Sequence, residues 1–280
     1  MNATDDWYDV SRLTERSDRI DEAGDYGMFL IEGEDRSVLV DAGAGVGDLR
    51  RLVEGLVDTP VTLVLTHTHW DHIGAAAGFD DVRVAPAELP ADGRITIDSH
   101  SDEFVDRPAA FAKRWTDHGY EFPDGVDPGT YAIDPADATA LSLEGGLDLG
   151  DRTLDVVELP GHSPGQVGLL DPATKTLYGG DVIHVDYDLY VMFERCDLGA
   201  YIDSFERVRD LRDRGAFDTL VTSHNEPFSG DSLSIVDDLL EGLREIAAEE
   251  REHETVETDW GPARSYRIGR SNVLLPAAAD

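Results

Sequence analysis

Short apolar segments alternate with amphipathic ones along most of the chain, which is typical of an α/β fold. Residues 61–66 are β-branched or apolar at almost every position, and such a run predicts a strand buried on both faces. Apolar side chains at helical spacing predict a helix over 198–211, opened by Asp197 and stopped by Gly215. The same spacing predicts another helix over 236–246.

Shorter segments fit the same alternation. A hairpin is predicted from strands at 27–32 and 37–41, followed by a short helix near 46–56. Further strands are predicted at 82–85, 154–159, 166–170, 176–178 and 219–222.

Residues 98–137 interrupt this rhythm. They are rich in Asp, Pro and Gly, carry scattered aromatic residues, and allow a helical piece near 108–118. A long excursion of this kind inside a domain is usually functional or disordered, and the aromatic residues favour a folded segment. We therefore expect a single domain over 1–254 with an inserted cap at about 98–137, and a C-terminal tail at 255–280.

The charge narrows the choice of partners. The 280 residues include 59 Asp and Glu but 23 Lys and Arg, for a formal net charge of −36. Such a polyanion repels phosphate backbones and anionic membrane surfaces, so neither nucleic acid nor a membrane is an expected partner. Lys113 and Lys175 are the only lysines, and the acidity is spread along the chain. In molar salt the Debye length falls to about 3 Å and screens this self-repulsion. The composition therefore resembles that of a salt-adapted protein, as in halophilic archaea.

The cellular location is predicted from the absence of disulfide, signal-peptide and membrane-span patterns in the sequence. Cys196 is the single cysteine, so no internal disulfide can form. Residues 1–6 have neither the basic region nor the apolar run of a signal peptide, and no stretch approaches the ~20 apolar residues of a membrane span. We expect a cytoplasmic protein.

The histidines suggest a metal site. His67, His69, Asp71 and His72 directly follow the buried strand, and imidazoles with a carboxylate suit zinc or a neighbouring divalent ion. In an extended loop His67 and His69 point to one side, and the next two side chains can reach a second position. A single ion cannot comfortably take all four ligands from so short a segment, so the spacing suggests two ions.

Further candidate ligands end other predicted strands. They are His162 in Pro-Gly-His-Ser-Pro-Gly, Asp181 in Tyr-Gly-Gly-Asp, and His224 in Thr-Ser-His-Asn.

This combination, His-x-His-x-Asp-His followed by a later His, Asp and His, resembles the metallo-β-lactamase superfamily over about residues 27–243. The resemblance implies a four-layer αβ/βα sandwich and two divalent ions, which we expect to be Zn²⁺. The first ion would be bound by His67, His69 and His162, and the second by Asp71, His72 and His224, with Asp181 bridging them. Asp41 matches an early Asp-x-Gly turn of the family, which implies a supporting role.

The resemblance also implies a reaction. A hydroxide bridging two ions would cleave an ester, thioester or lactone. Asp71 could accept or relay a proton, and His184 with Tyr187 or Tyr190 could bind the developing oxyanion. Equally, His184 could be a surface or supporting residue, and the two tyrosines could be pocket wall. Cys196 is expected to be a packing residue.

Three other histidines carry no such context. His100, His118 and His253 are expected to be exposed to solvent.

Differences from the motifs of individual superfamily branches indicate which branch the chain resembles most. Asp181 replaces the Cys of class B1 β-lactamases, while Trp70 and Asp181 are closer to glyoxalase II and the N-acyl homoserine lactonases. The Gly-Cys-Gly-Arg stretch of glyoxalase II is missing, and the acidic, aromatic segment 184–193 favours a neutral or acyl-bearing small molecule. A homodimer is possible.

Two alternatives remain at this point. The first is a mononuclear iron persulfide dioxygenase, a family that resembles glyoxalase II and leaves the second metal position unused. The other is a non-catalytic metal-binding relative, although no ligand position is degraded here.

Overall fold

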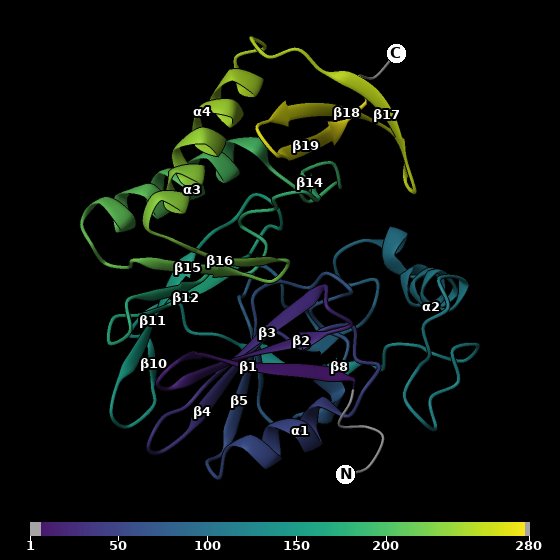
Figure 1. The fold of residues 1–280 in the computed structure, drawn as a ribbon, viewed down its shortest axis with the longest axis vertical. Helices are drawn as coiled ribbons and strands as arrows, with labels where there is room; N and C mark the ends of the chain where they lie inside the picture. Colours follow the sequence, from purple (N-terminus) through teal and green to yellow (C-terminus); the bar gives the residue numbers. More distant parts are fainter. Residues whose placement is uncertain (1–6, 278–280) are drawn as a thin grey trace. The chain divides into compact units, whose positions relative to one another are not determined.

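The computed structural model describes residues 7–277, and the chain divides into two units, Met1–Leu154 and Asp155–Asp280 (Figure 1). The N-terminal segment 1–6, for which we expected no signal peptide, and the end of the expected tail at 278–280 lie outside the described residues. The expected single domain over 1–254 spans parts of both units.

The first unit is organised around a seven-stranded sheet. Its strands lie in the order β1 (Tyr8–Thr14), β2 (Ser17–Glu22), β3 (Tyr26–Ile31), β4 (Ser37–Val40), β5 (Val61–Leu65), β6 (Val82–Val84) and β9 (Thr139–Ala140). The neighbours from β1 to β4 are antiparallel, and those from β4 to β9 are parallel. Helix α1 (Leu49–Leu56) provides the connection between β4 and β5, and its Leu49 and Val53 are buried in the core of this unit.

Strands β1 and β2 were not predicted from the sequence, because β1 is mostly exposed and β2 is highly charged. Strand β2 reads Ser-Asp-Arg-Ile-Asp-Glu, yet nearly all of it is buried. Ion pairs compensate part of this burial, since Arg12 Nε lies 2.9 Å from Asp18 and Arg19 Nη2 lies 2.7 Å from Asp21. Hydrophobic periodicity does not register a strand whose buried charges are paired.

The expected cap segment contains one clear helix, α2 (Arg107–Asp117), close to the predicted 108–118. Short elements surround it: η1 (Ala76–Gly78), β7 (Arg94–Ile95), η2 (Asp102–Phe104) and β8 (Ala136–Asp137), with β7 paired to β8. Phe104 and Phe111 are buried within the first unit. At least these two side chains therefore contribute to the packing of the first unit, so deleting the whole segment would remove part of its core.

A second, largely antiparallel sheet lies mostly in the second unit. Strand β10 (Leu147–Asp148), which belongs to the first unit, pairs with the first two residues of β11 (Thr153–Glu158). The sheet continues in the second unit with β12 (Val167–Asp171), β13 (Thr176–Tyr178), β15 (Thr219–Thr222) and β16 (Asn225–Ser229). Helix α3 (Leu198–Asp213) begins after Asp197, whose carboxylate accepts a hydrogen bond from the Ala200 N–H at 2.8 Å. The predicted N-cap is therefore confirmed.

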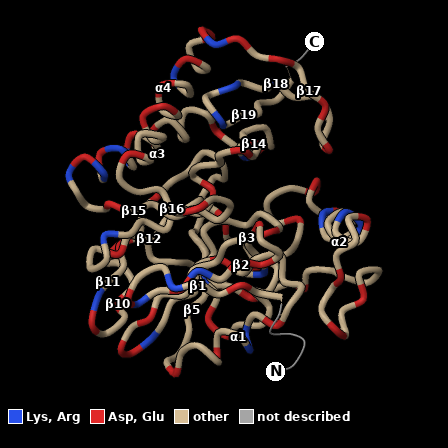
Figure 2. The backbone as a smooth tube through the Cα atoms, in the orientation of Figure 1, with Lys and Arg blue, Asp and Glu red and all other residues tan. Residues whose placement is uncertain are grey.

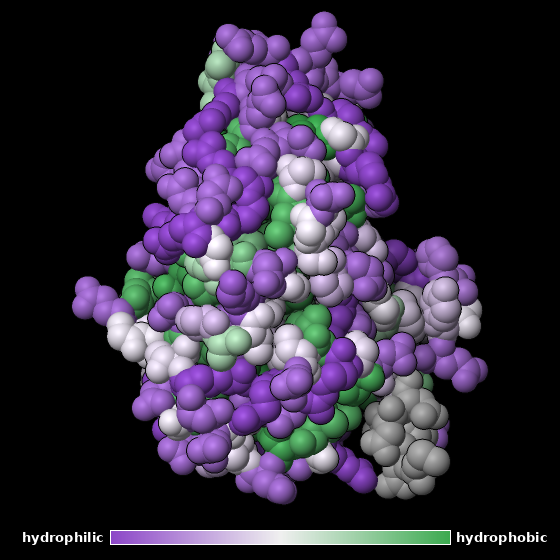
Figure 3. Space-filling model, turned by 60° about the vertical axis from the view of Figure 1, so that its left-hand side comes forward, coloured by the Kyte–Doolittle hydropathy of each residue, from purple (hydrophilic) through white to green (hydrophobic). Residues whose placement is uncertain are grey.

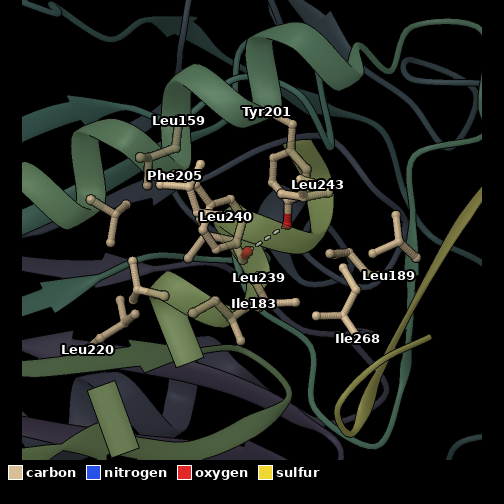
Figure 4. Packing of buried hydrophobic residues seen from close by; sticks show 14 of the residues in the cluster. Leu159, Ile183, Leu189, Tyr201, Phe205, Leu220, Leu239, Leu240, Leu243 and Ile268 are labelled. Carbon is tan, nitrogen blue, oxygen red and sulfur yellow. Dashed lines mark hydrogen bonds between the residues drawn. The ribbon is translucent and has the colours of Figure 1, made fainter. Parts of the chain in front are cut away.

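Helix α3 packs beside α4 (Ile235–Ala247), which follows η3 (Gly230–Ser234) (Figure 1). Tyr201 and Phe205 of α3 point into a cluster that includes Leu239 and Leu243 of α4 (Figure 4). The Tyr201 hydroxyl donates to the Val182 carbonyl at 2.6 Å, and burial raises the pKa of this tyrosine well above its usual value. Full burial of each such apolar side chain contributes roughly 1.5–3 kcal/mol.

Residues after α4 form strands. A separate four-stranded sheet has the order β14 (Asp188–Tyr190), β19 (Ser271–Pro276), β18 (Gly261–Ile268) and β17 (Glu254–Thr258). Most of the described part of the expected tail therefore lies in β17 to β19. Strand β14, which pairs in parallel with β19, comes from the segment between Asp181 and α3.

The acidic residues lie on strands, helices and loops of both units (Figure 2). Hydrophilic residues cover most of the face shown in Figure 3. Within residues 7–277, no helix combines the length and apolarity that a bilayer span requires.

This distribution of charge leads to a prediction about salt. Raising KCl from 0.1 M to 1 M shortens the Debye length from about 10 Å to about 3 Å and should weaken the repulsion among surface carboxylates. We expect the free energy of unfolding to rise by at least about 1 kcal/mol, which corresponds to ~2–4 °C in Tm. Thermal unfolding followed by circular dichroism, with sucrose at matched osmolality as the control, measures this effect. Equal free energies of unfolding at the two KCl concentrations would contradict the salt-adaptation hypothesis.

Candidate metal centre

The histidine-rich loop of the first unit follows the carboxyl end of β5, as predicted. His67, His69 and His72 are buried, and Asp71 is half-buried. The ring centroid of His67 lies 4.4 Å from that of His69 and 4.1 Å from that of His72. The Oδ1 atom of Asp71 lies 4.0 Å from His72 Nε2. The loop thus gathers all four of its predicted ligands.

Asp41 orients two of these imidazoles. Its Oδ2 atom lies 2.9 Å from His72 Nδ1 and accepts a hydrogen bond from Thr66 Oγ1, also at 2.9 Å. Thr66 Oγ1 in turn lies 3.0 Å from His67 Nδ1. Because the carboxylate only accepts and the threonine proton points to Asp41, both histidines donate from Nδ1. Asp41 thus fixes the orientation of both rings, which agrees with the supporting role expected of it.

Backbone contacts fix the shape of the loop. Ala42 N donates to His72 O at 2.9 Å, and Gly74 N donates to Gly43 O at 2.8 Å. A Cβ atom at Gly74 would lie 2.0 Å from the carbonyl carbon of Ala44, so only glycine permits this approach. The loop after β4 therefore acts as a template for the histidine-rich loop.

Aromatic residues of the cap pack against the same loop. The Trp70 ring, between two predicted ligands in the sequence, lies 5.6 Å from Tyr26 and 5.8 Å from Phe111 between ring centroids. Phe111 belongs to α2. The cap thus borders the histidine-rich loop through an aromatic cluster.

His100 is a correction to the sequence analysis. It was expected to be exposed, but it is buried, with its ring centroid 4.2 Å from that of His69 and its plane stacked on Phe104. The expectation failed because the fold of the cap, which the sequence pattern does not specify, brings His100 to the loop. His118 and His253 are exposed, as expected.

In the second unit, Asp181 is the central group. It follows β13, while His162 follows β11 and His224 follows β15, so each stands just beyond the end of a strand as predicted. The Oδ2 atom of Asp181 lies 3.7 Å from His162 Nε2 and 3.3 Å from His224 Nε2. The same oxygen lies 3.2 Å from His184 Nε2.

Strand β14 orients two of these histidines. His162 Nδ1 donates to the Tyr190 carbonyl at 2.7 Å, and His184 Nδ1 donates to the Asp188 carbonyl at 2.9 Å. Carbonyls two residues apart point to the same edge of a strand, so one edge of β14 holds both rings. The Val191 N–H, just past the strand, donates to Leu274 of β19 at 2.9 Å.

Contacts with α3 support the loop of His162. A Cβ atom at Gly161 would lie 2.3 Å from the Cβ of Tyr201, so a glycine is required there. Cys196, expected to be a packing residue, is half-buried, and its Sγ donates to the His162 carbonyl at 3.0 Å. This thiol therefore packs against the loop of a predicted ligand.

Tyr187 and Tyr190 differ in their placement. The side chain of Tyr187 is exposed, with its ring centroid 6.2 Å from that of His224. The ring of Tyr190 packs on Trp260 at 5.0 Å and on Phe193 at 5.9 Å. Of the two, Tyr187 is the one whose ring lies beside a predicted ligand.

The donor set of each unit fits a divalent ion. Histidines that bind a metal usually donate the N–H of their other ring nitrogen to a carboxylate, a carbonyl or a hydroxyl group. His67, His72, His162 and His184 all show this arrangement through Nδ1. Buried imidazoles with a buried carboxylate form the N/O set that suits zinc and its neighbours. Asp181, His184 and His224, all in the second unit, offer donor atoms within 4.8 Å of one another.

The chain is similar to a known protein family over most of its length. The family model for the metallo-beta-lactamase superfamily matches residues 28–217. The chain is similar to the acyl-coenzyme A thioesterase MBLAC2 of Gallus gallus, with 29% identity over 220 residues that cover 74% of each chain. Its counterpart in Bos taurus is 30% identical over 224 residues, covering 74% of this chain and 75% of that protein. A solved structure, the metallo-beta-lactamase from Pontibacter korlensis, matches with a TM-score of 0.54 and 17% identity, covering 85% of this chain and 99% of that chain.

Proposed function

The chain belongs to the metallo-beta-lactamase superfamily, and on that premise we propose that it is a dinuclear metal-dependent thioesterase that acts on acyl-coenzyme A-like substrates. The predicted fold class, the α/β sandwich of this superfamily, is confirmed. The family is hydrolytic, so the prediction of a metal-dependent hydrolase is confirmed as well. The metal count, the metal identity and the substrate are the proposed parts.

The observation that carries the proposal is the shared orientation of the histidines. In both units, histidine Nδ1 atoms donate to acceptors of the protein, which turns the Nε2 atoms toward other predicted ligands: His72 Nε2 lies 4.0 Å from Asp71, and His162 Nε2 lies 3.7 Å from Asp181. We propose that His67, His69 and His162 hold one ion and that Asp71, His72 and His224 hold the other. Asp181 would contribute to both, because its carboxylate already lies against His162 and His224.

Two divalent ions bound to these residues would supply a water molecule of lowered pKa and a Lewis acid for the carbonyl oxygen of the substrate. The protein residues have separate tasks. Asp41 and β14 hold the imidazole rings in one tautomer, which avoids reorganisation during the reaction. Asp71 is half-buried beside His72 and is the proposed acceptor or relay of the proton from water. Tyr187 is the proposed hydrogen-bond donor to the developing oxyanion.

A thioester is favoured among the expected ester, thioester and lactone substrates because both curated relatives described above are named acyl-coenzyme A thioesterases. The chemistry of the leaving group is compatible with the site. A departing thiolate has a conjugate acid of pKa about 8.5, so its release does not require a strong general acid. The half-buried Trp70, which packs on the buried Phe111, offers apolar surface beside the loop for an acyl chain.

The mononuclear iron persulfide dioxygenase is not favoured. The sequence resemblance implies that such an enzyme does not require the second-metal histidine, whereas His224 here lies 3.3 Å from Asp181. The named relatives are hydrolases.

A direct test measures thiol release from acyl-coenzyme A substrates of increasing chain length, in high salt, beside oxygen esters and lactones with the same acyl groups. We expect thioester hydrolysis with a kcat/KM of about 10⁴ M⁻¹s⁻¹ or more, lost on chelation and restored by Zn²⁺. His253→Ala, which removes an exposed imidazole, should leave the rate unchanged. Hydrolysis of lactones or esters without any thioester cleavage would contradict the substrate assignment.

A further inference from the structure

His184 is held in the second unit as firmly as the predicted ligands are. Its ring is buried, its Nδ1 is bound to the Asp188 carbonyl, and its Nε2 faces Asp181. The superfamily pattern that places the other ligands does not include it. We propose that His184 is an additional metal ligand, which binds the same ion as Asp181 and His224; this inference rests on the proposed metal-dependent function.

The orientation of the His184 ring favours metal binding. The Asp188 carbonyl can only accept, so His184 Nδ1 donates to it and Nε2 is turned toward Asp181. The Nε2 atom lies 3.2 Å from the Oδ2 atom of Asp181, so a cation bound by this carboxylate would be within reach of the imidazole. His162 Nε2 faces the same oxygen in the same way.

The spacing of the donor atoms also fits the ion proposed for Asp181 and His224. His184 would be a fifth protein ligand of this ion. When ligand atoms lie about 2.0–2.1 Å from a four- or five-coordinate zinc ion, neighbouring ligand atoms are roughly 2.9–3.6 Å apart. Asp181 Oδ2 lies 3.2 Å from His184 Nε2 and 3.3 Å from His224 Nε2. The ring centroids of His184 and His224 are 5.0 Å apart, and the rings are inclined by 79°, so they are not stacked on each other. Both distances from Asp181 fit a shared ion, and the three donor atoms all lie within 4.8 Å of one another.

The four-stranded C-terminal sheet also supports His184. The buried Ser271 of β19 donates its hydroxyl to the His184 carbonyl at 2.6 Å. Asn272, the next residue of β19, donates to the Asp188 side chain at 3.1 Å. Both the backbone of His184 and the acceptor for its ring are therefore fixed by strands. A solvated side chain would not need this anchoring, whereas a metal ligand benefits from it because its geometry must be preserved.

The proposal is tested by metal affinity. Apo-protein of the wild type, His184→Ala and His253→Ala is titrated with Zn²⁺ against a competing chelator in high salt, and circular dichroism verifies folding. Loss of a group that only supports a ligand typically weakens metal binding ~10–100-fold, so loss of His184 itself should raise the Kd of the more weakly bound zinc by at least ~10-fold. The control His253→Ala removes an exposed imidazole of the same unit and should match the wild type.

Unchanged zinc affinity in His184→Ala overturns the proposal and instead favours a direct contact between His184 and Asp181 that involves no metal. A second measurement uses the wild type alone and covers the case in which the variant does not fold. In ¹⁵N-labelled protein loaded with ¹¹³Cd, we expect metal coupling at the Nε2 of His184 in addition to His67, His69, His72, His162 and His224. Coupling at those five without His184 also overturns the proposal.

The number of bound zinc ions and the effect of His184→Ala distinguish a failure of the proposed function from a failure of the proposed role of His184. Wild-type protein that binds fewer than two zinc ions contradicts the proposed dinuclear function. If the wild type binds two zinc ions and His184→Ala binds them with the same affinity, the dinuclear function still holds. Only the role of His184 is then refuted.

Discussion

Asp181→Asn is expected to lose at least one metal ion and to lower thioesterase turnover by more than ~100-fold. Asp181 is buried, and one of its oxygens lies within 3.2–3.7 Å of the Nε2 atoms of His162, His184 and His224. The substitution keeps the shape of the side chain but removes the negative charge that two divalent ions would share. Elemental mass spectrometry and the rate of thiol release measure the two effects.

Asp171→Asn is the matched control. Asp171 is also buried in the second unit, at the end of β12, where its oxygens accept hydrogen bonds from the Ala173 N–H at 2.9 Å and from the Thr174 hydroxyl at 3.0 Å. An asparagine can still accept the first bond, and its amide group can donate to the Thr174 hydroxyl in place of the second. Its metal content and turnover should stay near wild type. An Asp181→Asn protein with both metals and the full rate would show that Asp181 is not a bridging ligand.

Glu22→Ala is expected to lower the free energy of unfolding by about 3 kcal/mol or more. The buried Glu22 carboxylate accepts hydrogen bonds from Trp7 Nε1 at 2.8 Å, Gly45 N at 3.0 Å and Val46 N at 2.8 Å. Alanine leaves three donors without this acceptor. Each buried donor that has no acceptor lowers the free energy of unfolding by about 1–3 kcal/mol. Denaturant unfolding of apo-protein at fixed high salt measures the loss.

The exposed Glu34 provides the control, because Glu34→Ala should stay within about 0.5 kcal/mol of wild type. The loop that Glu22 holds also hydrogen-bonds the backbone of the histidine-rich loop, so Glu22→Ala should weaken metal binding as well. A variant with wild-type stability would show that water or local rearrangement satisfies the donors.

The effect of Glu22 should depend on pH. Burial raises the pKa of Glu22 above 4.5, against the opposing effect of its hydrogen bonds from Trp7, Gly45 and Val46. A raised carboxyl pKa in the folded state adds stability that is fully present below pH 4.5 and is lost as the pH rises through the folded value. The deficit of Glu22→Ala relative to wild type should therefore be larger at acidic pH than at pH 7.

Elements with a clear apolar period could be predicted closely from the sequence. Strands β13 and β15 have the predicted bounds, and α3 begins after the predicted cap. The predicted ligands of each unit also gather within that unit, because they directly follow strands whose ends fix them. Local sequence was sufficient wherever one short segment determined both the element and the placement of its side chain.

Features that depend on distant partners could not be predicted. Nothing near Ser271 in the sequence indicates that it contacts the carbonyl of His184, because their meeting depends on the pairing of β14 with β19. The same holds for Glu22, whose hydrogen-bond partners Gly45 and Val46 belong to another loop. Buried polar residues of this kind resemble exposed ones in a hydrophobicity pattern, since only the tertiary fold supplies their hydrogen bonds.

We propose that two metal ions in one chain support thioester hydrolysis. The most direct test of this proposal is a titration of Zn²⁺ into apo-protein in high salt, with thiol release from an acyl-coenzyme A substrate recorded at each addition. We predict that activity rises until two equivalents of zinc are bound per chain and then stays constant. A plateau at one equivalent, or activity that appears only with iron and consumes oxygen, would contradict the dinuclear thioesterase.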